Sequence, residues 1–330
     1  MNYVMGIDIG INLVRLPDGT KFTSTIKKGT TLLNGMAHIV TWKNNEYVVG
    51  NQDGAINTLL YKLETDHYQL LLLTAVAVAV PSEQVINISI VTGVPIGFFE
   101  SLSQKFYNTI MNMGTQDIVI DGKKKSISIN NCIIFPESCF PYIDQNKYSL
   151  LKTFVIDIGD DIVNCSMWNG VNLKEHKSFP NAMISILQSL ATKIAENHSI
   201  IVDAMRIDYL MENDLYTYYG EDGAIDVKDL KKETLEDYTK ELVKSIKIKF
   251  KGSNSMGACD SIRLIGSASI PLNDYLFKYL ARFKDTIVLE SEPQFVNARI
   301  YDTLANIRFG SIKSKGYKQH SSTVTIDSIK

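Results

Sequence analysis

The chain has 330 residues, which is room for two domains or one large bilobed one at roughly 150 residues per domain. Apolar residues make up 45% and charged residues 21% of it, a composition that is typical of globular proteins and excludes a disordered or collagen-like chain. The 34 basic and 36 acidic residues leave a formal charge of -2. Such a balance gives no general attraction to nucleic acid or anionic lipid, so we expect any link to DNA to be indirect.

The longest apolar run indicates a buried helix and no membrane span. It covers the 11 residues Leu70 to Val80 and ends at Pro81, whereas roughly 20 residues are needed to cross a bilayer. The N-terminus shows neither the basic region nor the small-residue cleavage site of a secretory signal. We therefore expect a cytoplasmic protein without a membrane contact.

One four-residue motif occurs twice in the chain. Ile-Asp-Ile-Gly stands at residues 7–10 and again at 156–159. In each copy an apolar strand runs to the Asp, passes a Gly that permits a tight reversal, and continues as a second β-rich run. The repeat predicts two strand-turn-strand hairpins in corresponding positions of a duplicated unit.

Strand and helix patterns alternate around these hairpins, which is typical of layered α/β domains. In the first half, strands are predicted at 21–26, 46–49, 86–92, 117–120, 126–129 and 132–135, and helices before Pro81 and at 98–113. In the second half, strands are predicted at 172–176 and 262–265, and helices from about Pro180, at 231–249 and at 272–283.

The pattern predicts two lobes, residues 1–150 and 151–310, the second with a small inserted subdomain at about 200–230. The tyrosine-rich, acidic stretch from Tyr209 to Asp226 is interpreted as a contact surface or, equally, as an exposed edge of a lobe. Residues 311–330 are rich in Ser, Thr and Lys and are predicted to form a loosely packed polar tail, with a contact arm for a partner as the alternative.

The two hairpins make physical sense as a phosphate clamp. Each turn can direct backbone N–H groups at a phosphate oxygen, and the Gly lets the chain approach closely. Asp8 and Asp157, at the strand ends, can then hold the waters of a Mg²⁺ ion, which prefers one or two carboxylates plus substrate phosphates. A single such turn is weak evidence, because any strand can end in this way, but two matched copies favour the functional interpretation.

Two further segments are candidates for chemistry. Glu137 follows an apolar strand, where its carboxylate could accept a hydrogen bond from water that attacks a γ-phosphate; the alternative is the first turn of a helix, in which Pro-Glu is common. Gly266 and Ser267 follow the strand at 262–265, and their small side chains leave space for a nucleoside. That segment is equally an ordinary strand-to-helix turn.

In this order, the pieces resemble the actin, sugar kinase and DnaK-type chaperone superfamily, and within it the plasmid-segregating bacterial actins of the ParM/StbA group. The resemblance covers most of residues 3–310. It rests on the first hairpin with Arg15 where the family usually has Lys, on the strand at 88–92 with its following Gly-Val-Pro, and on residues 136–138, 154–159, 262–267 and 293–298. It implies an α/β, actin-like bilobed fold of two ribonuclease-H-like domains with a nucleotide cleft between them.

The resemblance also implies a set of ligands and site residues. The ligands are ATP or GTP and Mg²⁺. The implied roles are a catalytic carboxylate at Glu137, phosphate binding by Gly10, Ile11, Asn12, Arg15, Gly159, Asp160 and Asp161, nucleoside binding by Gly266 and Ser267, and metal binding by Asp8 and Asp157.

The second hairpin departs from the family pattern. The family usually has Asp-x-Gly-Gly-Thr-Thr-x-Asp, whereas here Asp160 replaces a Gly, Asp161 replaces a Thr and Asn164 replaces the last Asp. Extra carboxylates would repel the phosphates of a nucleotide unless they face the metal or solvent. The departure therefore affects the expected hydrolysis rate and metal geometry, while binding can persist through backbone donors.

Members of this group hydrolyse ATP or GTP, polymerise into filaments and move plasmid copies apart through a ParR-like adaptor that binds centromere-like DNA. The resemblance implies the same function here, with other copies of the chain and the adaptor as partners. The alternatives are a small-molecule kinase on the same fold, a nucleotide-binding scaffold with little turnover, which Asp160 and Asp161 favour, and a membrane-anchored cell-shape actin, for which no anchor is visible.

Overall fold

The computed structural model describes residues 2–29, 37–50, 63, 65–180, 182–202, 211, 213–217 and 224–310. Within these ranges the chain folds as two compact units. The first contains the described residues of Met1–Leu150, Asn169–Leu173 and Phe295–Lys330, and the second those of Leu151–Trp168 and Lys174–Gln294. Each unit combines a sheet with helices, which confirms the predicted α/β class.

The first unit is built on a nine-stranded sheet in the order β3-β2-β1-β7-β9-β8-β5-β6-β4. Strands β1, β7 and β9 pair in parallel, and β2, β3, β8, β5, β6 and β4 continue the sheet in antiparallel pairs. The strands are β1 (Asn2–Ile9), β2 (Leu13–Arg15), β3 (Lys21–Thr23), β4 (Ile26–Lys28), β5 (His38–Trp42), β6 (Asn45–Val49), β7 (Val85–Val94), β8 (Thr115–Ile120) and β9 (Lys123–Pro136).

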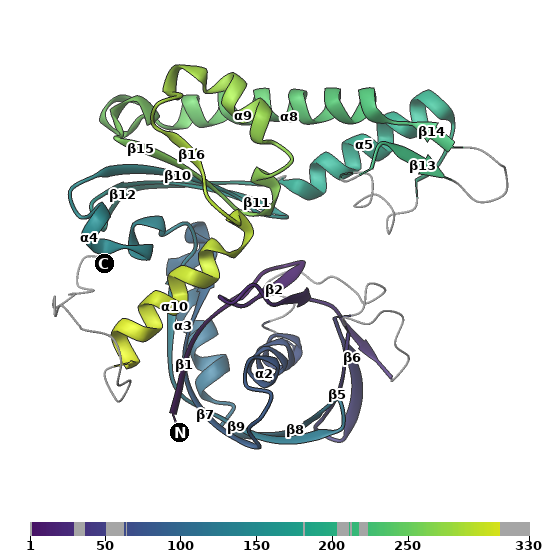
Figure 1. Ribbon diagram of the computed structural model, residues 1–330, viewed down its shortest axis with the longest axis vertical. Helices are drawn as coiled ribbons and strands as arrows, with labels where there is room; N and C mark the ends of the chain where they lie inside the picture. The colour runs from purple at the N-terminus through teal and green to yellow at the C-terminus, as the bar shows by residue number, and fades with distance from the viewer. Residues whose placement is uncertain are drawn as a thin grey trace. The chain divides into compact units, whose positions relative to one another are not determined.

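Helix α2 (His67–Ala79) lies inside the curve of this sheet, as Figure 1 shows. Every side chain from Leu70 to Ala77 on this helix is buried. A helix that is apolar on all sides is stable only when it is surrounded by other parts of the protein. The buried helix predicted from the apolar run is thus confirmed, and among the described residues no helix is long and apolar enough to cross a membrane.

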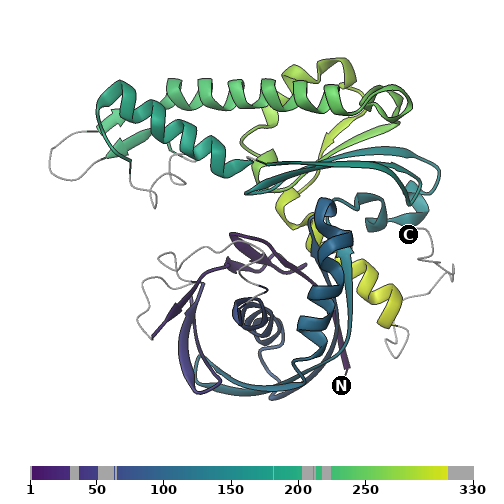
Figure 2. The same ribbon diagram turned by 180° about the vertical axis from the view of Figure 1, so that it is seen from behind.

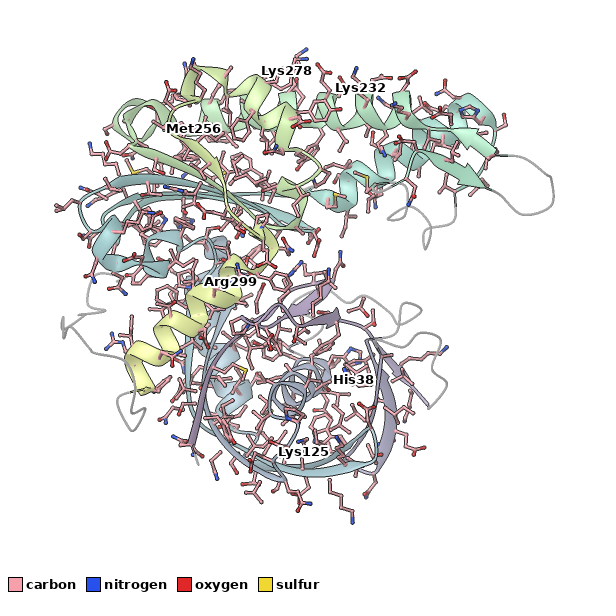
Figure 3. All side chains as sticks on the ribbon, viewed as in Figure 1. His38, Lys125, Lys232, Met256, Lys278 and Arg299 are labelled. Carbon is pink, nitrogen blue, oxygen red and sulfur yellow. The ribbon has the colours of Figure 1, made fainter. Side chains whose placement is uncertain are left out.

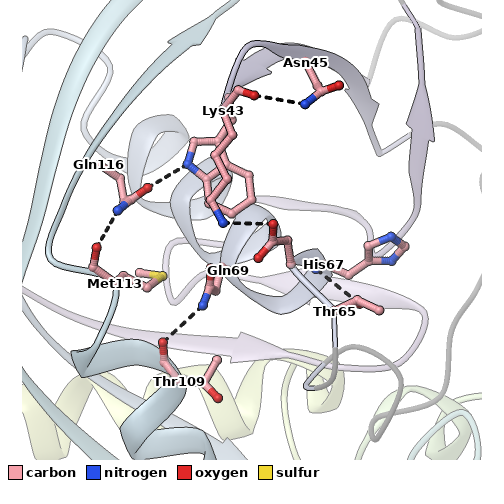
Figure 4. Close-up of polar contacts among 10 residues, drawn as sticks. Lys43, Asn45, Thr65, His67, Gln69, Thr109, Met113 and Gln116 are labelled. Atoms are coloured by element: carbon pink, nitrogen blue, oxygen red, sulfur yellow. Dashed lines mark hydrogen bonds and ion pairs between the residues drawn. The ribbon is translucent and has the colours of Figure 1, made fainter.

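Polar contacts fix the start of α2 within the sheet (Figure 4). Asp66, just before the helix, accepts a hydrogen bond from Lys43 Nζ at 2.8 Å. Gln69, in its first turn, donates to the carbonyl oxygen of Thr109 at 3.3 Å. The turn between β5 and β6 and helix α3 (Phe99–Met111) therefore both hold the helix in place.

Two further helices pack on the first sheet, and one of them, α3, lies on the same face as α2, where the rings of Phe106 and Tyr68 meet edge to face at 4.9 Å. Helix α3 packs on β9, and α10 (Val296–Phe309), although last in sequence, packs on β1 and β7. The predicted boundaries had placed residues 295–310 in the second lobe, whereas this helix belongs to the first unit because its buried face contacts the first sheet. A short 3-10 helix (Phe140–Ile143) and α4 (Gln145–Tyr148) follow β9.

The second unit has a five-stranded sheet in the order β12-β11-β10-β15-β16. Strand β10, the first of this sheet along the chain, pairs in parallel with the later β15, as β1 pairs in parallel with β7 in the first unit. Helices α8 and α9 pack against one face of the sheet, around an apolar cluster that includes Phe154, Ile156 and Leu264. The elements are β10 (Lys152–Ile158), β11 (Ile162–Asn169), β12 (Asn172–Pro180), α8 (Lys228–Lys249), β15 (Ser261–Ile265), α9 (Asn273–Tyr279) and β16 (Ile287–Leu289).

Helix α5 (Met183–His198) runs beside α8 and ends near a small hairpin of β13 (Leu215–Thr217) and β14 (Ala224–Asp226), as both Figure 1 and Figure 2 show. A separate apolar cluster joins Leu190 and Ile194 of α5 to Val202 and Val227. The hairpin falls within the subdomain predicted at about 200–230. Apart from residues 211, 213–217 and 224–226, the tyrosine-rich stretch lies outside the described residues, and so does the tail at 311–330.

Several element predictions are wrong in detail. The strand predicted at 21–26 is two strands, β3 and β4, which stand at opposite ends of the sheet order. The strands predicted at 126–129 and 132–135 form the single strand β9, which pairs with β7 over its whole second part. A register shift between Ile88 and Ser89 accommodates Asn130 as one extra residue of β9, and the next residue, Asn131, donates from Nδ2 to Ser89 Oγ at 3.0 Å. Pro180 ends β12 instead of starting a helix, and α5 begins at Met183.

Candidate functional site

The two Ile-Asp-Ile-Gly motifs form hairpin turns of the same design. In the first, β1 and β2 pair antiparallel and Gly10 N donates to Leu13 O at 3.0 Å. In the second, between β10 and β11, Gly159 N donates to Ile162 O at 3.1 Å. The predicted hairpins are therefore confirmed, with the same bond closing both turns.

Main-chain carbonyl groups of the first turn are held by a serine that sequence reasoning missed. Ser24 is 2% exposed; its hydroxyl donates to Gly10 O and its N–H to Asn12 O, both at 2.8 Å. A carbonyl bonded within the protein does not face an incoming anion, so this arrangement suits a turn that receives phosphate. The side-chain Oδ1 of Asn12 is also buried and has no hydrogen-bond partner among the described residues. Because a half-turn of the amide exchanges its oxygen and nitrogen, this end of Asn12 can also present a donor.

The second turn is held instead by the start of α5. Ala182 N donates to Asp161 O at 3.2 Å, and Ile184 N donates to Asp160 O at 2.9 Å. Both carbonyl groups thus satisfy N–H groups that have no partner within the helix. The two hairpins therefore have turns of the same kind, but different elements of the protein hold these turns in place.

Asp8 and Arg15 face each other across the first hairpin. They are register partners on β1 and β2, with Nη1 of Arg15 3.7 Å from Oδ2 of Asp8, and the side chain of Arg15 is 7% exposed and that of Asp8 9%. Gly10 leaves room for the guanidinium, because a Cβ there would lie 3.0 Å from Arg15 Nη1. The predicted metal residue and the predicted phosphate residue are therefore neighbours.

Asp157 is the residue before the last of β10 and lies against the turn after β15. It is 4% exposed, and a Cβ on Gly266 would lie 2.6 Å from its Oδ1 and closer still to Ile158 O. Gly266 has φ of 87° and ψ of 157°, a conformation that only glycine adopts readily. The structure thus brings the predicted nucleoside-side turn next to the second hairpin.

The carboxylate of Asp160 is directed toward this same turn. Its Oδ1 accepts a hydrogen bond from Ser267 Oγ at 3.0 Å. From the sequence we expect the Asp160 carboxylate to face the metal or solvent. In the structure it instead accepts a hydrogen bond from the hydroxyl of Ser267. Asp161 is exposed, and Asn164 is buried, with Oδ1 accepting from Ser178 Oγ at 2.7 Å.

Glu137 lies in a turn that follows β9 directly. The N–H of Glu137 donates to Val94 O at 2.9 Å, and Glu137 is half-buried. The next residue, Ser138, has φ of 63° and its N–H donates to Oδ1 of Asn297 on α10 at 3.3 Å. The segment therefore forms a fixed turn and not the first turn of a helix. Asn297 is a second supporting residue that the sequence analysis did not predict, because it lies 159 positions away from Ser138 along the chain.

The charges of the two strand-end aspartates affect buried groups around them. Burial raises the pKa of the Cys165 thiol on β11, and the charge of Asp157 adds to the effect. Burial likewise raises the pKa of Tyr68 on α2, with a smaller contribution in the same direction from Asp8. The Cys165 thiol and the Tyr68 hydroxyl therefore remain protonated at neutral pH.

The donor set fits a hydrated magnesium ion better than a protein cage. No group of three or more His, Cys, Asp or Glu residues that could hold a metal occurs in the part of the chain that the structure describes. Each hairpin offers one buried strand-end carboxylate, Asp8 or Asp157. Mg²⁺ commonly keeps most of its waters and takes only one or two carboxylates, so these residues match its chemistry.

Residues 6–139 match the family model described as the actin like proteins N terminal domain. No curated protein matches the sequence.

Three solved structures are similar over nearly their whole length. The pCBH ParM non-polymerisable quadruple mutant has a TM-score of 0.76 at 16% identity, over 92% of this chain and 99% of that one. ParM in a 15-stranded filament from Clostridium botulinum has a TM-score of 0.76 at 18% identity, over 93% and 99%. The archaeal actin homologue Ta0583 in complex with ADP has a TM-score of 0.74 at 16% identity, over 92% and 99%.

Likeness at these identities shows the fold. The resemblance to ParM-type actins found in the sequence is therefore confirmed at the level of the fold: the chain has an actin-like α/β fold, and its residues 6–139 match the model of an actin-like N-terminal domain.

Proposed function

We propose that this chain is an actin-like nucleoside triphosphatase that polymerises when it binds ATP or GTP and segregates plasmid DNA through an adaptor protein. The observation that carries the proposal is the pair of matched turns closed by Gly10 and Gly159, in which bonds from Ser24 and α5 hold the main-chain carbonyl groups. Each such turn is suited to bind phosphate oxygens through its N–H groups.

Each site residue has a role in this proposal. The N–H groups of the residues after Gly10 and Gly159, namely Ile11, Asn12, Asp160 and Asp161, bind phosphate oxygens, and Arg15 adds a positive charge. Gly266 and Ser267 border the nucleoside. Asp8 and Asp157 hold the waters of Mg²⁺, which supplies charge neutralisation for the phosphates when it is bound. Glu137 orients the attacking water, because phosphoryl transfer depends mainly on positioning and charge neutralisation.

Relatives of the same fold support the assembly part of the proposal. ParM of Clostridium botulinum and Alp12 both have filament structures, so we propose other copies of this chain as its first partner. The formal charge of -2 agrees with DNA that is bound by a ParR-like, centromere-binding adaptor and not by the chain itself. We propose that the protein acts in the cytoplasm.

A second candidate, a nucleotide-binding scaffold with little turnover, is favoured by one observation. Asp160 adds a carboxylate beside the second hairpin, where the resembling family usually has Gly, and negative charge there opposes the approach of phosphates. Binding and assembly without turnover would then be the outcome. A small-molecule kinase remains the alternative from another functional class.

High-speed sedimentation with bound-nucleotide analysis tests the proposal. The chain is incubated with Mg-ATP, Mg-GTP, a non-hydrolysable analogue of each, or no nucleotide. We expect it to pellet only with the triphosphate that it binds, and with its analogue. Binding without any pellet at all concentrations and salts would contradict the polymerising function and would lead to a screen of small phosphate acceptors. Absence of nucleotide binding would contradict both.

A further inference from the structure

Asp160 connects three elements of the second unit. Its main-chain oxygen accepts from Ile184 N at the start of α5 at 2.9 Å. Its carboxylate accepts from Ser267 Oγ, 107 positions later in the chain, at 3.0 Å. It is itself the first residue after Gly159 in the hairpin. One residue therefore links the hairpin, the helix start and the turn after β15.

The turn that Asp160 holds has little freedom of its own. Gly266 N donates to Pro293 O at 2.9 Å, and Gly266 lies directly against Ile158 O and the Asp157 carboxylate. A shift of Ser267 would move this glycine relative to Asp157. The bond between Ser267 and Asp160 thus closes a second connection between the turn and the hairpin, beside the contact at Gly266.

We propose that Asp160 is a positioning residue that couples the Gly266–Ser269 turn to the second phosphate hairpin, so that a nucleoside held at the turn fixes the hairpin for the phosphates. The inference rests on the proposed nucleotide site and deepens it. It also assigns a purpose to the carboxylate that stands where the resembling family has Gly. The charge is directed to a hydroxyl donor, and a hydrogen bond to an ionised acceptor is stronger than one to a neutral acceptor.

A double-mutant cycle measures this coupling. The affinities of Asp160→Ala, Ser267→Ala and the double variant for the preferred magnesium nucleotide are compared with wild type by calorimetric titration. We expect each single variant to bind about tenfold more weakly, as for one lost hydrogen bond to a charged group. The double variant should bind no more weakly than the weaker single one, because each change removes the same bond.

A conservative variant separates positioning from charge. Asn keeps an acceptor oxygen for the Ser267 hydroxyl but carries no charge, so Asp160→Asn should recover most of the affinity that Asp160→Ala loses. If the carboxylate acts on the metal, Asn will not rescue binding. If it mainly repels phosphates, both variants will bind more tightly than wild type. Either result overturns the inference.

Controls keep the test decisive. Asp285→Ala changes an exposed aspartate of the same unit, just before β16, and should leave the affinity unchanged. Thermal unfolding of each variant is recorded in parallel. If Asp160→Ala does not fold, Asp160→Asn takes its place in the affinity measurements. Multiplicative effects in the cycle would overturn the coupling while wild-type binding stands. Failure of wild-type binding would instead overturn the nucleotide site.

Discussion

The guanidinium of Arg15 lies 3.7 Å from the carboxylate of Asp8, across the pair of strands that forms the first hairpin, and both side chains are more than nine-tenths buried. A buried charge is tolerated when an opposite charge accompanies it. The pair therefore gives each residue a structural role besides the proposed binding of phosphate and metal.

Replacement of Arg15 should reveal this pair through stability. Arg15→Met leaves the Asp8 carboxylate buried without its cation, so we expect the free energy of unfolding to fall by about 3–5 kcal/mol. Arg15→Lys keeps the charge and should lose less. Urea denaturation of both variants without nucleotide measures the difference. Equal stability of Arg15→Met and wild type would show that solvent replaces the pair without cost.

Substitution of Gly266 should damage the site more than an ordinary glycine substitution. In Gly266→Ala the new Cβ would meet Ile158 O and Asp157 Oδ1, in a backbone conformation that is strained for alanine. We expect a loss of more than about 3 kcal/mol in unfolding free energy, together with weaker nucleotide binding. Gly252→Ala is the matched control, since Gly252 also has positive φ but nothing within 4 Å of a new Cβ, and it should lose only about 1 kcal/mol. Equal losses would contradict the contact with Asp157.

Asp302 on α10 should give the stability a pH dependence. Burial raises the pKa of its carboxyl group, although bonds from Gly6 N and Asn306 oppose the shift. A carboxyl group with a raised pKa in the folded state stabilises the protein fully below its unfolded pKa of about 4, and this stability is lost as the pH rises through the folded value.

Asp302→Asn keeps an acceptor for Gly6 N without a charge. We therefore expect the variant to be at least as stable as wild type at pH 7 and to lose this advantage as the pH falls toward 4. Chemical denaturation at several pH values measures it, with the exposed Asp117→Asn as control. A variant advantage that grows toward acid pH would refute the assignment.

Lys125 holds the chain reversal between α2 and β7. Its Nζ donates to the carbonyl oxygens of Val80, Pro81 and Glu83 at 2.7, 3.1 and 2.7 Å, and the residue is 4% exposed. Figure 3 labels Lys125 on the first unit. Lys125→Met would leave these oxygens without their donor, so we expect a loss of about 1–3 kcal/mol. Lys124→Met, at the exposed neighbouring position of β9, should change the unfolding free energy by less than about 0.5 kcal/mol. Equal effects would show that the three bonds contribute nothing.

The local parts of this fold could be predicted from the sequence. The repeated Ile-Asp-Ile-Gly gave both hairpins because strand pattern, Asp and Gly all lie within a few residues. The apolar run before Pro81 gave α2, since only a buried helix tolerates apolar residues on every side. The break expected between 129 and 132 did not occur, because pairing with β7 overrides the weak strand propensity of two asparagines.

The supports of the site could not be predicted in the same way. Ser24 reaches back 14 positions to Gly10, Ser267 reaches 107 positions to Asp160, and Asn297 reaches 159 positions to Ser138. Each of these contacts depends on packing between elements, and none has a local pattern. The same reason accounts for α10, whose place on the first sheet depends on β1 and β7 and not on its neighbours in the chain.

Light scattering with simultaneous phosphate release tests the central claim most directly. Mg-ATP or Mg-GTP is added to wild type and to Glu137→Ala. We expect nucleotide-triggered scattering in both proteins, with phosphate release at least about 100-fold slower in the variant, because the proposed role of Glu137 is to orient the attacking water and not to bind the nucleotide. Flat scattering in both proteins with nucleotide bound, or phosphate release by Glu137→Ala at the wild-type rate, would contradict it.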